Sequence, residues 1–217
     1  MLRTPLLILI AICFATSLAL QAQDIQIKKG TVAVSGENPG IRLMMKEGAP
    51  AATDVSFWRV VYSPAGMGHV AFVTSDLTGN GPSSDDVRVA LTDNDALVDY
   101  IGRDIMSVFN KAHVENPFPK VRATFTKSGN TSREWKETIK GGKYTVDLIW
   151  RDFYTPFLID MPVGGQFMYG ITSMFIPARS ADVVINGKKA AGTPFPEPMG
   201  SMPSSSAFLA FSETWVK

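Results

Sequence analysis

The sequence predicts a mainly β protein, either an antiparallel β-sandwich or a partly closed barrel, with one amphipathic helix at about residues 93–112. Two observations carry this prediction. Short segments rich in β-branched and aromatic residues alternate with clusters of Gly, Pro, Asn and Ser along most of the chain. One central stretch instead repeats its apolar residues at helical spacing. Because no internal repeat or second core pattern is found, residues 23–217 are expected to form a single β-rich domain.

The first 23 residues, MLRTPLLILIAICFATSLALQAQ, differ from the rest of the chain. Arg3 precedes an apolar run from Pro5 to Ala15, and a small-residue site follows at Leu20-Gln21-Ala22. This is the pattern of a cleaved secretory signal peptide. A retained membrane anchor is the alternative, but the run is short for a span of about 20 apolar residues. Residues 1–22 are therefore predicted to be a signal peptide, and the mature chain to be periplasmic or secreted, without a transmembrane anchor.

Composition narrows the chemistry of the mature chain. Cys13 is the only cysteine and lies inside the predicted signal peptide. Removal of that peptide would exclude disulfides, cysteine nucleophiles and thiolate metal sites. The whole chain has 21 Lys+Arg against 20 Asp+Glu, so the loss of Arg3 leaves the mature chain formally neutral. This balance indicates no nucleic-acid partner and no anionic membrane partner.

The first half of the chain carries a hairpin pattern. Residues 56–63 (SFWRVVYS) and 67–74 (MGHVAFVT) are strand-like and flank the turn residues Pro64-Ala65-Gly66. Short alternating runs on either side of a Pro and Gly turn are typical of two antiparallel strands. These segments are predicted to pair with each other.

The predicted helix follows. Its apolar residues fall on one stripe at helical spacing: Leu97, Val98, Ile101, Ile105, Val108 and Phe109. Thr92, with Asp95 three residues later, resembles a capping box at its N-terminus. The helix is expected to cover part of the sheet or one end of a barrel.

Three strand-like runs at 120–127, 132–140 and 143–151 predict an antiparallel meander, with turns at Ser128–Thr131 and Gly141-Gly142. In the last run, the face that carries Val146, Leu148 and Trp150 is predicted to be core. In the middle run Glu137 lies between two apolar residues of the same face. We expect a strand edge where its carboxylate reaches water; the alternative is a carboxylate in a cavity with a raised pKa.

The last third of the chain reads as further strands. Residues 166–177 (QFMYGITSMFIP) form one candidate, with Gly170 marking a bend or bulge. A second candidate, 182–190, contains Asn186-Gly187, a strong signal for a type I′ hairpin turn. A Pro-rich surface loop at 192–206 leads to a final apolar strand at 207–216, which is expected to lie within a sheet.

Two features raise the question of a metal site. Asp76 to Asp86 places oxygen donors at alternate positions before glycine, but Val87 stands where a calcium loop of the EF-hand type needs a bidentate carboxylate. A plain polar loop is the favoured interpretation. His69 shares a strand face with Ala71, and no second histidine lies at zinc-site spacing. No metal site is predicted, and His69 is favoured as a hydrogen-bonded core or pocket residue.

The densest polar and aromatic cluster runs from Trp150 to Asp160, at the end of a predicted strand. Arg151 could bind a carboxylate or phosphate, Tyr154 could donate a hydrogen bond, and Asp152 or Asp160 could act as a base. The favoured alternative is an Arg–Asp pair that fixes the corner of the strand. The candidate ligand-binding residues are therefore His69, Arg151, Asp152, Tyr154 and Asp160. A G-x-S-x-G serine elbow and a Gly-rich phosphate loop are both absent. The sequence leaves the cofactor unknown.

Four segments, LTDNDALVDYI at 91–101, YTVDLIW at 144–150, VVINGKKAAGTPFP at 183–196 and AFLAFSETWV at 207–216, carry a resemblance to a family. The chain is similar to uncharacterised bacterial exported proteins that end in such a strand. The resemblance implies a bacterial source and one continuous domain. It implies no activity, cofactor or site residue.

Three functions remain open at this point. Aromatic residues are frequent on the apolar faces, so a cavity that binds a lipophilic small molecule is our first hypothesis. The second is an enzyme whose pocket is formed by His69 and the 151–160 segment. The third is a structural or partner-binding envelope protein, for which a wide exposed apolar patch would be expected.

Overall fold

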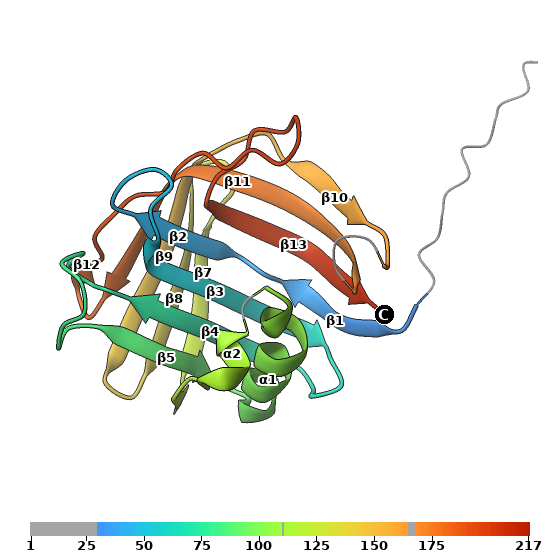
Figure 1. The fold of residues 1–217 in the computed structure, drawn as a ribbon, viewed down its shortest axis with the longest axis horizontal. Helices are drawn as coiled ribbons and strands as arrows, with labels where there is room; N and C mark the ends of the chain where they lie inside the picture. The colour runs from blue at the N-terminus through green and yellow to red at the C-terminus, as the bar shows by residue number, and fades with distance from the viewer. Residues whose placement is uncertain (1–29, 110, 165–167) are drawn as a thin grey trace, which may run out of the picture.

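The computed structural model describes residues 30–109, 111–164 and 168–217, so the predicted signal peptide lies outside the described residues. The chain is mainly β, with one short helical segment, which confirms the predicted fold class (Figure 1). A large mixed sheet dominates the structure and folds over on itself, and it is not a closed barrel. For clarity we treat its two layers as sheet A and sheet B.

Sheet A is the larger layer. Its strands follow the order β6-β5-β4-β3-β1-β13-β11, with β2 also lying between β3 and β13, and β10 beside β11. All neighbours are antiparallel except β5 and β6. The strands are β1 (Val32–Glu37), β2 (Gly40–Met44), β3 (Ala51–Tyr62), β4 (Gly68–Ser75), β5 (Val87–Thr92), β6 (Lys120–Arg122), β10 (Phe157–Met161), the first half of β11 (Gly170–Ile185) and β13 (Ala207–Val216).

Sheet B contains the second half of β11 and the predicted meander. Its strands are β7 (Thr124–Asn130), β8 (Glu134–Gly141), β9 (Tyr144–Phe153) and the short β12 (Lys188–Lys189). The two segments expected at 166–177 and 182–190 are joined, because β11 is one strand of 16 residues that belongs to both sheets. The turn at its end is confirmed, since Asn186 and Gly187 have φ of 51° and 79°.

The helical segment is shorter than expected. It comprises α1 (Asp95–Tyr100), a π-helical turn η1 (Ile101–Ile105) and a 3-10 turn η2 (Met106–Val108), with the separate α2 at Ala112–Glu115. Asn94 is the N-cap, and its side chain accepts a hydrogen bond from the Ala96 amide. The prediction that Thr92 caps the helix is wrong, because Thr92 still pairs with Val70 inside the sheet. The change from π to 3-10 geometry shifts the apolar stripe, so that Phe109 is 53% exposed.

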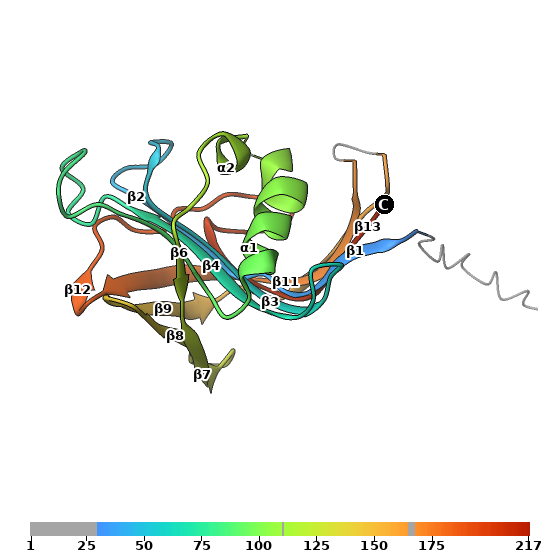
Figure 2. The ribbon, with the colours of Figure 1, turned by 90° about the horizontal axis from the view of Figure 1, so that it is seen from below.

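Sheet A has a covered layer on each side. Figure 2 shows the helical segment above sheet A and strands β7, β8 and β9 below it. Between the two sheets lies a core that includes Phe57, Leu148 and Trp150, and the indole of Trp150 donates a hydrogen bond to the Gly40 carbonyl (3.0 Å). The predicted core face of β9 is thereby confirmed. A second apolar cluster joins sheet A to the helix through residues such as Leu97.

Alternate residues of β3 face different layers. Phe57 packs in the core shared with sheet B, whereas its neighbour Trp58 packs in the helix-side cluster. The final strand β13 pairs with β1, β2 and β11, so it lies within sheet A as expected. In the part of the chain that the structure describes, no helix combines the length and apolar character needed to cross a membrane.

Candidate functional site

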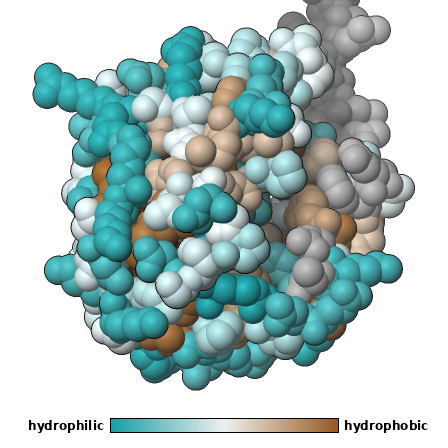
Figure 3. Space-filling model, turned by 60° about the vertical axis from the view of Figure 1, so that its left-hand side comes forward, coloured by the Kyte–Doolittle hydropathy of each residue, from teal (hydrophilic) through white to brown (hydrophobic). Residues whose placement is uncertain are grey.

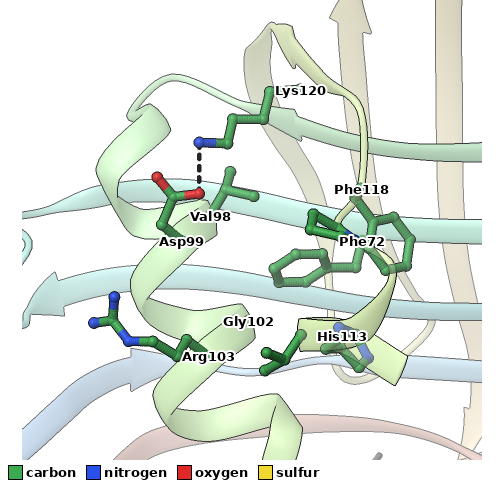
Figure 4. Close-up of a pocket in the computed structure, with 10 residues that line it drawn as sticks. Phe72, Val98, Asp99, Gly102, Arg103, His113, Phe118 and Lys120 are labelled. Atoms are coloured by element: carbon green, nitrogen blue, oxygen red, sulfur yellow. Dashed lines mark ion pairs between the residues drawn. The ribbon is translucent and has the colours of Figure 1, made fainter. Parts of the chain in front are cut away.

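Two adjoining recesses open on the helix-covered side of sheet A. They share three rings, those of Phe72, His113 and Phe118, as a common wall. The first has a volume of about 260 Å³ and is bounded by α1 and the chain around residues 113–120. In Figure 4 the three rings gather on one side, and Val98 of α1 and Gly102 of η1 lie on the other. This first recess is mainly apolar.

The common wall is a compact aromatic group. The rings of His113 and Phe118 stack at 5.3 Å between centroids, and Phe72 meets both rings edge-on or nearly so, at 5.4 and 5.3 Å. The guanidinium of Arg88 lies 3.9 Å from the centroid of Phe118. Burial lowers the pKa of His113, and the positive charge of Arg88 lowers it further. Both effects favour the uncharged form of the His113 ring, which suits contact with apolar groups.

The second recess, of about 360 Å³, has a polar floor. The register of sheet A aligns one residue from each of β2, β3, β4 and β5 in a row across the strands: Arg42, Asp54, Thr74 and Arg88. The last three line the recess together with Ser56. The polar row thus adjoins the aromatic wall.

The two charged residues of the recess floor are held differently. Arg88 donates hydrogen bonds to the carbonyl oxygens of Pro117 (3.0 Å) and Asn116. Asp54 is open to solvent, yet the surrounding recess walls desolvate its carboxyl and raise its pKa, while nearby Arg42 opposes this shift. Arg42 itself pairs with Glu197. Among the described residues, neither Asp54 nor Arg88 forms an ion pair.

His69, a residue singled out from the sequence, lies elsewhere, on the sheet B side of sheet A. Its Nδ1 is 2.6 Å from Asp93 Oδ2, and its Nε2 accepts a hydrogen bond from Arg59 Nε (3.3 Å). Its ring stacks on Phe125 at 4.7 Å between centroids. These partners fix the tautomer with the proton on Nδ1. Both nitrogens are engaged, which agrees with the favoured interpretation of a hydrogen-bonded residue.

Next to His69 lies an ion pair that the sequence did not indicate. The carboxylate of Glu137 is 0% exposed and accepts two hydrogen bonds from Arg59 Nη2, at 2.9 and 2.8 Å, and one from Trp135 Nε1, at 3.0 Å. The expectation that Glu137 reaches water is wrong, because sheet A covers this face of β8. Burial raises its pKa, and Arg59 acts against that rise. Arg59 also pairs with Glu37.

This network joins the two sheets. Arg59 comes from β3 and Glu37 from β1 of sheet A, whereas Glu137 comes from β8 of sheet B. The Arg59 guanidinium is shared among Glu137, Glu37 and His69, so its hydrogen-bonding capacity is largely used within the protein. The arrangement connects the two sheets through side chains that are already paired with one another.

The structure does not bring the other predicted site residues to His69. Arg151 alternates with core residue Trp150 and so faces outward from sheet B, where Nε is 2.7 Å from Glu134 Oε2 and Nη1 is 2.7 Å from Asp182 Oδ2. The expected Arg–Asp pair at this corner therefore exists with a different partner, Asp182, which the long β11 places beside β9.

The remaining three residues are dispersed. Asp152 is exposed with a positive φ of 54°, and Tyr154 lies under the guanidinium of Arg179 at 4.0 Å. Asp160 is exposed on β10, opposite Thr172. No shared recess joins these residues to His69 among the sites described above.

The possible calcium loop closes on itself. Asp76 Oδ1 accepts a hydrogen bond from the Gly79 amide (2.8 Å), and Oδ2 accepts one from the Gly81 amide (2.7 Å). Both oxygens thus stabilise the turn, as expected for a plain polar loop. Within the residues that the structure describes, no group of three or more His, Cys, Asp or Glu side chains is placed to hold a metal ion.

Surface character bears on the third hypothesis. On the face seen in Figure 3, hydrophilic side chains predominate and hydrophobic ones appear in small separate areas. That face shows no wide apolar patch of the kind expected for a large partner interface.

Comparison with known proteins gives little further guidance. No family model matches the chain, and no curated protein matches it. Among solved structures, acetoacetate decarboxylase from Legionella pneumophila subsp. pneumophila str. Philadelphia 1 is similar over 87% of this chain and 84% of that chain, with 12% sequence identity and a TM-score of 0.37.

Proposed function

We propose that the protein binds a small amphipathic molecule in the paired recess between α1, the 113–120 segment and strands β3–β5. The observation that supports this proposal is the junction of an apolar recess and a polar recess at one aromatic wall. The larger recess, at about 360 Å³, falls within the range of about 300–1,000 Å³ typical of ligand pockets. A lipophilic ligand was the first hypothesis from sequence; the polar floor adds a requirement for a polar end.

The two ends would contribute differently. An apolar group placed against Phe72, Phe118 and Val98 would lose contact with water, and each 100 Å² of its surface so buried contributes about 2.5 kcal/mol. The hydroxyls of Ser56 and Thr74 line the polar end. Ser56 already donates to Asn38 Oδ1 and accepts from Trp58 Nε1, so the Thr74 hydroxyl is the one that offers a ligand a hydrogen bond to fix its orientation.

Gly102 offers a selective way to block the recess. It is buried in η1 and lines the first recess, and a Cβ built at this position meets no atom within 4 Å. A leucine there would fill the recess without a backbone clash, and it has a higher helix propensity than glycine. Thr126→Leu, on the exposed edge strand β7 of sheet B, is the matched control.

The test uses fluorescence titration with 8-anilino-1-naphthalenesulfonate, an amphipathic aromatic probe. We expect saturable binding that Gly102→Leu weakens at least tenfold and Thr126→Leu leaves unchanged. Equal binding by the wild type and Gly102→Leu would contradict the proposal. Circular dichroism of both variants checks that the fold is retained.

We also propose that the protein acts outside the cytoplasm. The support is the pattern of residues 1–22, with Arg3 before an apolar run and a small-residue cleavage site. Intact mass measurement of the protein expressed at full length in a bacterial host tests this. A periplasmic species lacking about 22 residues is expected, whereas an uncleaved cytoplasmic product would refute export.

A further inference from the structure

We propose that the ligand of the paired recess is a zwitterion with an apolar side chain, whose ammonium group pairs with Asp54 and whose acidic group pairs with Arg88. The inference rests on the proposed function and adds the chemical class of the ligand. Its apolar side chain would lie against the aromatic wall of Phe72, His113 and Phe118.

The strand register sets the spacing of the two charges. Asp54 of β3 is directly opposite Thr74 of β4, which is directly opposite Arg88 of β5. Neighbouring strands lie about 4.8 Å apart, so the backbones that carry the two charges are about 10 Å apart. All three residues line the same recess. A small ligand over Thr74 can therefore reach both charges at once.

The side chains of Asp54 and Arg88 do not form an ion pair with each other. The guanidinium of Arg88 lies over Phe118 and donates to the carbonyl oxygens of Asn116 and Pro117, on the β6 side of the recess. These two bonds leave further N–H donors of its five unused. The side-chain carboxylate of Asp54 forms no hydrogen bond or ion pair with any residue that the structure describes, although its backbone lies in the sheet between β2 and β4. A ligand acid group can therefore bind Arg88 while those carbonyl contacts remain.

Charge balance favours a zwitterion over a ligand with one charge. Arg42 lies near Asp54 but forms its ion pair with Glu197, so the carboxylate of Asp54 and the guanidinium of Arg88 have no ion-pair partner among the described residues. A cationic ligand would pair with Asp54 and leave Arg88 uncompensated, and an anionic ligand would do the reverse. Burial of unpaired charges is unfavourable, so a molecule that pairs both should bind tightest.

The test compares three compounds that share one phenyl ring: phenylalanine, 2-phenylethylamine and 3-phenylpropionate. Isothermal titration calorimetry measures the Kd of each for the full-length chain as purified. We expect phenylalanine to bind at least tenfold more tightly than either singly charged compound. Competition with the fluorescent probe, and loss of binding in Gly102→Leu, would locate it in the recess.

Variants at the two charges assign the contacts. Asp54→Asn should weaken the binding of phenylalanine at least fivefold and should not weaken that of 3-phenylpropionate, which leaves the Asp54 charge unpaired in the wild type. Arg88→Gln should remove the preference for phenylalanine over 2-phenylethylamine. Arg88→Lys keeps the positive charge but loses the paired N–H donors of the guanidinium, so it should retain part of that preference. This second variant is needed because Arg88→Gln could also disturb the local structure. Asp85→Asn, an exposed carboxylate 3.7 Å from Lys188, is the matched control.

The outcomes separate the two proposals. If the probe binds in the recess but the three phenyl compounds bind equally, or none binds, the zwitterion inference is wrong and the proposed function stands. The zwitterion inference is also wrong, and the proposed function also stands, if Asp54→Asn leaves the Kd of phenylalanine unchanged. If Gly102→Leu leaves binding of the probe unaffected, the proposed function itself fails.

Discussion

Replacing Arg59 with methionine should destabilise the protein strongly. The substitution removes both hydrogen bonds from Nη2 to the carboxylate of Glu137, at 2.9 and 2.8 Å, and leaves that carboxylate with the Trp135 indole at 3.0 Å. Methionine keeps most of the apolar length of the arginine stem, so lost packing is small. The main effect is therefore an uncompensated charge between the two sheets.

The magnitude follows from burial. Breaking a buried ion pair by removing one partner costs about 3–5 kcal/mol. The Glu37 side chain is 22% exposed, so loss of its contact adds at most about 1 kcal/mol. For a chain of this size, 1 kcal/mol corresponds to about 2–4 °C in Tm, so we expect Tm to fall by about 6–24 °C.

The effect should depend on pH with a definite sign. Burial already raises the pKa of Glu137 in the folded protein, and Arg59 acts to lower it. In Arg59→Met the folded pKa rises further above the unfolded value of about 4.3. Stability is then fully present below that unfolded value and is lost as pH rises through the folded pKa. The difference between variant and wild type should therefore be largest at neutral pH and shrink on acidification.

Urea unfolding of four proteins tests the reasoning: wild type, Arg59→Met, Glu137→Gln and the double variant. The double variant should recover most of the loss, because the buried amide carries no charge and still accepts from Trp135. Arg42→Met is the matched control, since Arg42 and Glu197 are 45% and 37% exposed and their pair should contribute less than about 1 kcal/mol. A loss in Arg59→Met no larger than in Arg42→Met, or one that is independent of pH, would refute the argument.

Three further predictions concern stability. Glu213 is buried, accepts hydrogen bonds from Trp215 and Asn38, and forms no ion pair with a described residue, so burial raises its pKa. Glu213→Gln should make the free energy of unfolding less dependent on pH and should stabilise the protein above the folded pKa of Glu213, as urea titrations from pH 4.5 to 9 would show. Trp150→Ala should cost about 3–5 kcal/mol in chemical denaturation, because it empties the core between the sheets and removes the bond to Gly40; a loss below about 1 kcal/mol would mean that this core is loosely packed. Gly187→Ala should cost about 1–2 kcal/mol in thermal unfolding, since φ is 79° there, and an unchanged Tm would argue against the type I′ turn.

Local patterns in the sequence were sufficient for much of the fold. The β3–β4 hairpin, the β8–β9 hairpin and the Asn186-Gly187 turn are each specified by neighbouring residues, and all three occur. The length of β11 was not predicted, because its two halves pair with different strands and each half alone reads as a separate segment. The start of the helix was predicted wrongly because Thr92 pairs with Val70 in the sheet, which a local capping pattern does not show.

The candidate site was less accessible to prediction. Asp54 and Arg88 lie in ordinary strand segments, and only the register of β3, β4 and β5 brings them to one recess. The aromatic wall adds His113 from α2, and only the tertiary fold brings this residue beside Phe72 of β4. The residues predicted from the sequence were chosen because they are polar or aromatic and lie close together along the chain. The polarity of one segment does not reveal which face of a sheet another layer will cover.

Strand β3 shows why coverage decides the role of each residue. Arg59 and Phe57 face sheet B, whereas Asp54 and Ser56 face the helical side, as the period of two requires. From the sequence, a strand with polar residues on both faces resembles one that is partly solvated on both sides. In the fold, β8 closes one face of β3, and Arg59 on that face pairs with the buried carboxylate of Glu137. The other face is only partly closed, by Met106 of η2 and His113 of α2, so Asp54 remains open to a ligand. The same strand therefore supplies the ionic link between the sheets and the floor of the proposed binding site.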